Sequence, residues 1–166
     1  MDLISIFNTA FQIFIEPFRD INVFWTLIPV YLNWILCEVF FEFERHNFQS
    51  AFSNGFAALW VGMDWFRVLR FPFSWDYRAI IAIFMTTYGL FIMLEAARGK
   101  SIAKYVGRVR EVTFAVIFLT PVLHGLMVVD LEMLLGGLVV YVVLAIFGFV
   151  TSRLVPAIGG EIADKR

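Results

Sequence analysis

The sequence predicts an all-α integral membrane protein, and two observations lead to that prediction: its composition and the length of its apolar runs. Of the 166 residues, 61% are hydrophobic and only 16% are charged, whereas an ordinary soluble domain is about half apolar and roughly a quarter charged. A soluble core of this length would leave much apolar surface in water. Lipid is therefore expected to cover that surface.

The four expected transmembrane helices are residues 21–43, 79–94, 112–129 and 133–150. A helix needs about 20 predominantly apolar residues, and at least about 17, to cross a hydrocarbon core of roughly 30 Å. The first run meets this length easily, and the last two are adequate. The second is short and must borrow a flanking residue such as Tyr77 or Glu95. We expect one helical transmembrane domain over residues 21–166.

The N-terminal segment, residues 1–20, is amphipathic rather than uniformly apolar. Its polar residues recur every three to four positions, and phenylalanines fill the other side. These polar residues are Ser5, Thr9, Gln12, Glu16 and Arg19. The pattern predicts a helix that lies along the membrane interface. The N-terminus lacks the positive region and cleavage site of a secretory signal.

Residues 48–70 form a second amphipathic segment, in which an apolar stripe is interrupted by polar side chains from Gln49 to Asp64. Its longest continuous apolar run, 56–63, is too short to cross a bilayer. We interpret the segment as an in-plane or re-entrant helix, with a fifth membrane crossing as the alternative. Gly55 and Gly62 would suit the turn of a re-entrant segment.

Residues 95–111 form a third amphipathic segment, which is basic. It carries five cations against two glutamates: Arg98, Lys100, Lys104, Arg108 and Arg110, with Glu95 and Glu111. By the positive-inside rule, this segment and the C-terminus are expected in the cytoplasm, with the protein in the cell membrane. The same cations are candidates for contact with anionic lipid headgroups.

The positive-inside rule does not choose between four and five crossings. Four crossings leave nine lysines and arginines on the cytoplasmic side and four on the other, and five crossings give the same totals because Arg19 and Arg45 exchange sides. The polar content of residues 48–66 favours four crossings.

Three ionisable residues within apolar stretches are the candidate functional side chains: Glu38, Asp64 and His124. Charged groups at membrane depth are costly, so each needs a partner or a role. Glu38 has Arg45 at helical spacing, or else handles a proton, a cation or a metal ion. Asp64 has Arg67 three residues on, or else faces a polar cavity. His124 is expected to be a helix-packing histidine, with a proton relay or ligand contact as the alternative.

Small residues are spaced along the last apolar run at helical intervals. They are Gly136, Gly137, Ala145 and Gly148. Small residues let helix backbones approach closely in a membrane. We expect them to contact another helix of this chain or of a partner protein.

Several functional classes lack support in the sequence. There is no HExxH or GxSxG motif and no other catalytic constellation, so the chain is not expected to be an enzyme. The net charge of -1 and the lack of a soluble basic patch argue against nucleic-acid binding. Cys37 is the only cysteine, which excludes an intrachain disulfide and a multi-cysteine metal site. No metal or cofactor is expected.

Three functions fit these features. The first is a non-enzymatic membrane subunit or scaffold that packs against other transmembrane helices or against itself. The second is an oligomeric transporter or channel for ions, protons or a small solute, in which Glu38, Asp64 and His124 line a polar route. The third is a lipid-modifying enzyme that combines Glu38 or Glu42 with the basic segment. The four-crossing topology disfavours the third function, because it puts those two elements on opposite sides of the membrane.

Overall fold

The computed structural model describes residues 2–40, 48–69 and 76–154, with side chains for 2–37, 48–69 and 76–151. Every regular element in these ranges is a helix, which confirms the predicted all-α class. The helices in chain order are α1 (Leu3–Arg19), α2 (Ile21–Phe40), α3 (Phe48–Leu69), α4 (Tyr77–Ala97), α5 (Ser101–Val106), α6 (Val109–Leu123) and α7 (Leu131–Leu154).

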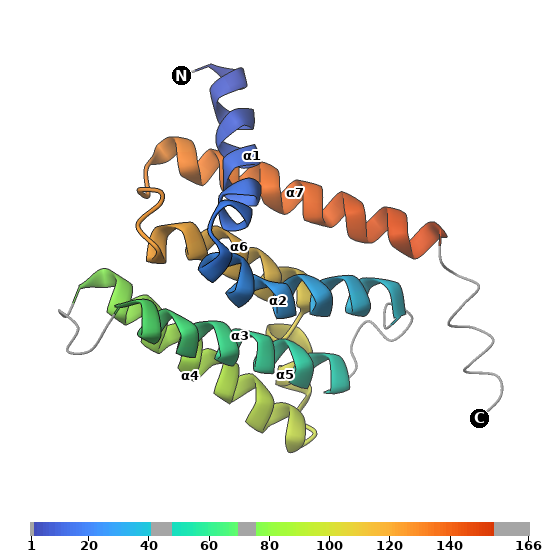
Figure 1. Cartoon of the computed structure of the whole chain (residues 1–166). Coiled ribbons are helices and arrows are strands. Elements are labelled where there is room, and N and C mark those ends of the chain that lie inside the picture. Colours follow the sequence, from blue (N-terminus) through green and yellow to red (C-terminus); the bar gives the residue numbers. More distant parts are fainter. Residues whose placement is uncertain (1, 41–47, 70–75, 155–166) are drawn as a thin grey trace.

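Helices α2, α3 and α4 lie side by side and alternate in direction (Figure 1). Thr26 near the start of α2 bonds to Asp64 near the end of α3, whereas Asn33, further along α2, bonds to Asn54, nearer the start of α3. Residue numbers therefore rise along one helix as they fall along the other. The same reversal relates α3 to α4, because Gly55 faces Gly89 and Met93 while Gly62 faces Thr86.

Helices α6 and α7 continue this alternation. Gly137 of α7 lies against Phe118 of α6, and the ring of Tyr141 meets the ring of Phe114 edge-on at 5.3 Å. These two contacts again run in opposite directions along the two helices. Helices α2, α3, α4, α6 and α7 consequently share two common ends. One end holds the start of α2 and the end of α3, and the other holds the end of α2, the start of α3, and α5.

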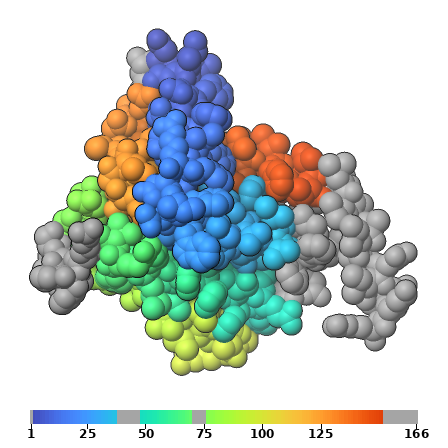
Figure 2. Space-filling model, viewed as in Figure 1, coloured from blue at the N-terminus to red at the C-terminus, as the bar shows by residue number. Residues whose placement is uncertain are grey.

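Helix α1 does not follow the direction of the others. The chain bends by 108° between α1 and residues 21–37 of α2, so α1 stands across the bundle in Figure 1. Figure 2 shows the side chains of α1 and α2 forming the near surface, with α7 extending from beneath them on one side. A Cβ on Gly136 of α7 would lie 3.0 Å from the backbone nitrogen of Ala10. Helix α1 is thus seated directly on α7.

Within the described ranges, two helices are long and apolar enough to cross a membrane: Tyr77–Ala97 and Leu131–Thr151. The bent pair Leu3–Arg19 and Ile21–Cys37 would add a third if it formed one crossing. The expected crossings 79–94 and 133–150 lie within α4 and α7. A helix of 21 residues reaches about 31 Å, close to the thickness of a hydrocarbon core.

The other expected crossings differ from the structure or extend outside it. Residues 41–43 of the first lie outside the described ranges. The third, 112–129, is not one helix, because α6 begins at Val109 and ends at Leu123. Gly125 adopts a positive φ of 70° and donates its backbone N–H to Val122, a local geometry that closes a helix. With 15 residues, α6 is only about 22 Å long.

Helix α3 is one unbroken helix, and its glycines pack against α4. A Cβ on Gly62 would lie 2.7 Å from the backbone nitrogen of Thr86, and one on Gly89 would lie 2.4 Å from that of Leu59. No side chain fits at these positions, so glycine allows the two backbones to approach. The turn that the sequence suggested at Gly55 and Gly62 is wrong, because both residues lie inside α3 and at its contact with α4.

The start of α4 is fixed by a side-chain cap. The carboxylate of Asp76 accepts hydrogen bonds from the backbone N–H groups of Arg78 at 3.0 Å and Ala79 at 3.1 Å. These are donors that the first turn of a helix otherwise leaves unpaired. The backbone hydrogen bond from Ala79 is the main cause that holds the pKa of Asp76 below its ordinary value. The carboxylate therefore stays ionised at neutral pH and specifies where α4 begins.

Candidate functional site

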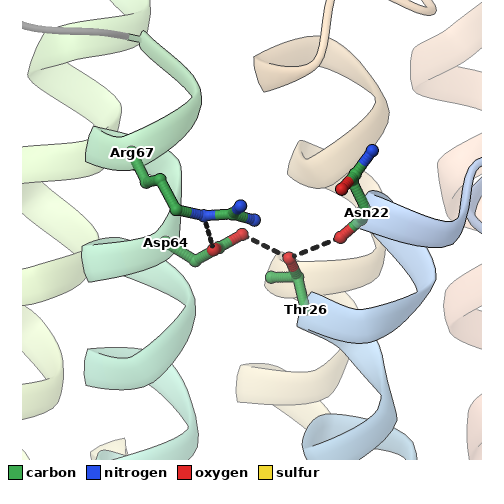
Figure 3. A network of polar contacts seen from close by, with 4 residues as sticks. All are labelled: Asn22, Thr26, Asp64 and Arg67. Atoms are coloured by element: carbon green, nitrogen blue, oxygen red, sulfur yellow. Dashed lines mark hydrogen bonds and ion pairs between the residues drawn. The ribbon is translucent and has the colours of Figure 1, made fainter.

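Asp64 of α3 lies in a polar network with α2 (Figure 3). One carboxylate oxygen accepts a hydrogen bond from Nε of Arg67 at 2.7 Å, and the other accepts from the hydroxyl of Thr26. The Thr26 hydroxyl also lies 3.1 Å from the backbone carbonyl of Asn22. The side chain of Asp64 is 13% exposed and that of Arg67 is 59% exposed. Both oxygens of Asp64 are thus paired, and the predicted Asp64–Arg67 pair is present.

His124 lies at the same end of the bundle as Asp64. It follows the last turn of α6 and donates its backbone N–H to Thr120 at 3.0 Å. Its Nε2 atom is buried and has no hydrogen-bond partner among the described residues. The carboxylates of Asp64 and Asp20 are near enough to interact with the imidazole electrostatically. Two of the three predicted ionisable candidates therefore lie at the same end of the bundle.

Glu38 belongs to the other end of the bundle. Its backbone lies in α2, while its side chain is outside the described residues. Twelve helical positions separate it from Thr26, which corresponds to about 18 Å along the axis. The backbone of Glu38 is thus far from the Asp64 network along α2.

A second polar cluster, which the sequence did not identify as a site, is centred on Asn54 of α3. This side chain is fully buried. Its Nδ2 donates to the backbone carbonyl of Gly107 at 2.6 Å, and its Oδ1 accepts from Nδ2 of Asn33 at 2.7 Å. The hydroxyl of Ser53 donates to Oδ1 of Asn33, and the thiol of Cys37 lies 3.8 Å from Oδ1 of Asn54. The cluster connects α2 and α3 to the turn after α5.

A third polar contact joins α1 to α7. The carboxylate of Glu132 accepts hydrogen bonds from the hydroxyls of Ser5 and Thr9, the latter at 2.8 Å. Both hydroxyls belong to the polar face that the sequence predicted for the N-terminal helix. That face is used, at least in part, to bind another helix of the same chain.

The small residues of α7 are also used within the chain. Gly136 lies against α1, and a Cβ on Gly137 would lie 2.5 Å from the ring of Phe118 in α6. Gly148 is buried and Ala145 is half-buried. Gly136 and Gly137 therefore contact other helices of this chain, which was one of the two outcomes expected from the sequence.

The basic segment lies at the end of the bundle that holds Asn54. The ammonium of Lys104 is 4.1 Å from the ring centroid of Phe48, the first residue of α3. Arg98 pairs with Glu95 at 3.1 Å, and Arg108 pairs more loosely with Glu111 at 3.9 Å. The Lys104–Phe48 contact joins the basic segment to α3, and the two ion pairs lie within the segment itself. Arg110, the fifth cation of the predicted set, is half-buried at the start of α6.

The end of α2 and the basic segment lie at the same end of the bundle. Cys37 in the last turns of α2 lies beside Asn54, and Asn54 binds Gly107 at the end of α5. The four-crossing topology expects these two elements on opposite sides of a membrane, with residues 48–70 in the membrane plane. In the structure α3 runs antiparallel to α4 and returns the chain along the bundle. Among the described residues, no group of three His, Cys, Asp or Glu side chains could hold a metal ion.

The Asn33–Asn54 bond is expected to contribute measurably to stability. In a double-mutant cycle with Asn33→Ala and Asn54→Ala, we predict a coupling of about 0.6–2 kcal/mol, because either change removes the hydrogen bond between the two amides. Unfolding of the purified protein in mixed detergent micelles measures the coupling. Asn54→Ala combined with Thr151→Ala, whose hydroxyl bonds only within α7, should be additive. Equal couplings in the two cycles would contradict this role.

Comparisons of the chain with protein-family models, with curated proteins and with solved structures found no match. What the protein does is accordingly inferred from the three polar clusters, the basic segment and the apolar surface described above.

Proposed function

We propose that this chain is an integral membrane protein in which α2, α3, α4, α6 and α7 cross the bilayer in alternating directions, with α1 along one interface. The contact between α3 and α4 supports this topology. Helix α4 is long and apolar enough to cross a membrane, and α3 packs antiparallel along it with backbone contacts at Gly55, Gly62 and Gly89. A helix held so closely along a crossing helix runs across the membrane with it.

The polar residues of α3 are compatible with a crossing because they are paired. Asn54 bonds to Asn33 and Gly107, and Asp64 bonds to Thr26 and Arg67. Polar side chains in a bilayer are costly when they face lipid and serve as links when they bond across helices. The proposal thus replaces four crossings with five. Nine basic residues again lie on the cytoplasmic side, with Arg45 in place of Arg19.

Five crossings predict that the N-terminus and the basic segment lie on opposite sides. In a Cys37→Ser background, Asp2→Cys and Ser101→Cys should react with a membrane-impermeant maleimide from opposite faces of sealed vesicles. Both positions are exposed. With four crossings and an in-plane α3, the two cysteines would react from the same face. Labelling of right-side-out and inverted vesicles distinguishes the two topologies.

Within this topology, we propose that the protein is a non-enzymatic subunit or scaffold that packs against other transmembrane helices or a second copy of itself. The main supporting observation is that Asp64 and Asn54 are used in bonds between helices of the chain itself. Helix α7 presents an uninterrupted apolar surface, with Leu134, Leu138 and Ile146 all more than half exposed. Such a surface suits contact with lipid or with another apolar helix.

The scaffold role predicts specific protein contacts on the outer face of α7. A photo-crosslinking residue at Leu138, irradiated in intact membranes, should give one adduct of defined stoichiometry with another membrane protein or a second copy. The same residue at Leu144, which is fully buried, should give no intermolecular adduct. Mass spectrometry and a reciprocal pull-down identify the partner. A protein that yields only lipid adducts and migrates as a lone monomer in mild detergent is not a subunit.

A transporter or channel is the second candidate, and the buried Nε2 atom of His124 favours it, because this atom has no partner among the described residues. A polar ligand could bind there. Purified protein in liposomes should then pass protons or cations. Asp64→Asn should lower the flux, whereas Glu16→Gln on α1 should not. Glu38→Gln tests the third predicted residue. Flux no greater than that of empty vesicles excludes this candidate.

A further inference from the structure

The basic segment carries positive charge that the described residues do not neutralise. Arg98 and Arg108 each have a glutamate partner, at 3.1 and 3.9 Å. Neither Lys100 nor Lys104 has an ion-pair partner in the part of the chain that the structure describes, and Lys100 is exposed. Lys104 instead holds its ammonium over the ring of Phe48 at 4.1 Å. A cation held over a ring still attracts an anion.

The segment also has a fixed place relative to a candidate membrane crossing. Helix α4 ends at Ala97, and Gly99 with a φ of 66° turns the chain directly into α5. Since α4 has the length of a hydrocarbon core, α5 begins at the level of the lipid headgroups. This step rests on the membrane topology proposed above.

Helix α5 is held rigidly from its inner side. Ala103 is fully buried, and the backbone carbonyl of Val106 accepts a hydrogen bond from the hydroxyl of Tyr88. The next carbonyl, of Gly107, accepts from the side chain of Asn54 at 2.6 Å. Gly107 itself is required, because a Cβ there would lie 2.8 Å from the carbonyl of Ala103. The short helix thus presents a constant outer face.

That outer face combines apolar and basic side chains. Ile102 is 47% exposed and Tyr105 is 61% exposed, and Lys100 and Lys104 flank them in sequence. The guanidinium of Arg108 lies 5.8 Å from the centroid of the Tyr105 ring. Exposed apolar side chains bordered by cations are typical of a helix in the headgroup layer of an anionic leaflet, where tyrosine is also enriched.

We propose that α5 and its flanking residues form a binding site for the phosphate headgroup of an anionic phospholipid. Lys100, Lys104 and Arg108 donate hydrogen bonds to the phosphate oxygens. Ile102 and Tyr105 contact the glycerol and upper acyl region. The bound lipid extends the contact of α5 with the membrane and holds the basic end of the bundle at its surface.

The test titrates the full-length protein in mild detergent with phosphatidylglycerol or with phosphatidylcholine and follows thermal unfolding. Only phosphatidylglycerol should raise the Tm of the natural chain, and high salt should reduce the effect. Each cation near an anionic surface contributes about fivefold to affinity, so Lys100→Gln with Lys104→Gln should weaken the apparent affinity roughly twentyfold. The matched control, Arg19→Gln with Arg78→Gln, removes two charges at the other end and should retain the full effect.

Each other outcome is decisive. Equal stabilisation by the two lipids, or equal losses in the two double variants, overturns the proposal. Stabilisation of the same size by soluble glycerol phosphate would assign the site to a free phosphate rather than to a lipid, and also overturns it. Lys104 contacts Phe48, so the double variant could fail to fold. In that case the single variant Lys100→Gln provides the affinity measurement, because it changes only an exposed side chain. The cysteine-labelling experiment tests the topology separately, so a failure of lipid binding can be told apart from a failure of the proposed topology.

Discussion

The backbone contact between α3 and α4 determines how the rest of the molecule is arranged. Gly55, Gly62 and Gly89 bring the two helices so close that any side chain at these positions would collide with a neighbouring main chain or side chain. Once α3 is fixed antiparallel to α4, its Asn54 is positioned for Gly107 and its Asp64 for Thr26. The position of α2, and the assignment of each charged segment to one end of the bundle, follow from those bonds.

Polar side chains have a consistent role in this bundle. Each of the three clusters joins helices that are distant in sequence: Asp64 joins α3 to α2, Asn54 joins α3 to α2 and Gly107, and Glu132 joins α7 to α1. In an apolar environment a hydrophobic contact barely distinguishes a neighbouring helix from lipid, whereas a hydrogen bond does. The few polar residues therefore specify which helices meet, while the apolar residues make the outer surface suited to an apolar environment.

Hydropathy and periodicity predicted α4 and α7 well, because those helices are long and almost uniformly apolar. They predicted the Asp64–Arg67 pair because both residues lie one turn apart on the same helix. For residues 48–70 they favoured an in-plane or re-entrant helix over a fifth crossing, since a hydropathy sum counts Asn54 and Asp64 as polar and contains no information on their partners. The carbonyl that Asn54 binds is 53 residues away. The early end of α6 had a local signal in Pro121 and Gly125, but the apolar run continues past it.

The unequal lengths of the adjacent helices α6 and α7 have a consequence for the surrounding lipid. With 15 and 24 residues, the two differ by about 14 Å in axial length. The contacts of Gly137 with Phe118 and of Tyr141 with Phe114 bring the end of α6 level with the start of α7. The extra length of α7 therefore extends past the start of α6, at the end of the bundle that holds α5. If both helices cross the bilayer, hydrophobic mismatch is concentrated there, and lipid that thins or admits water at that place would do so beside the basic segment.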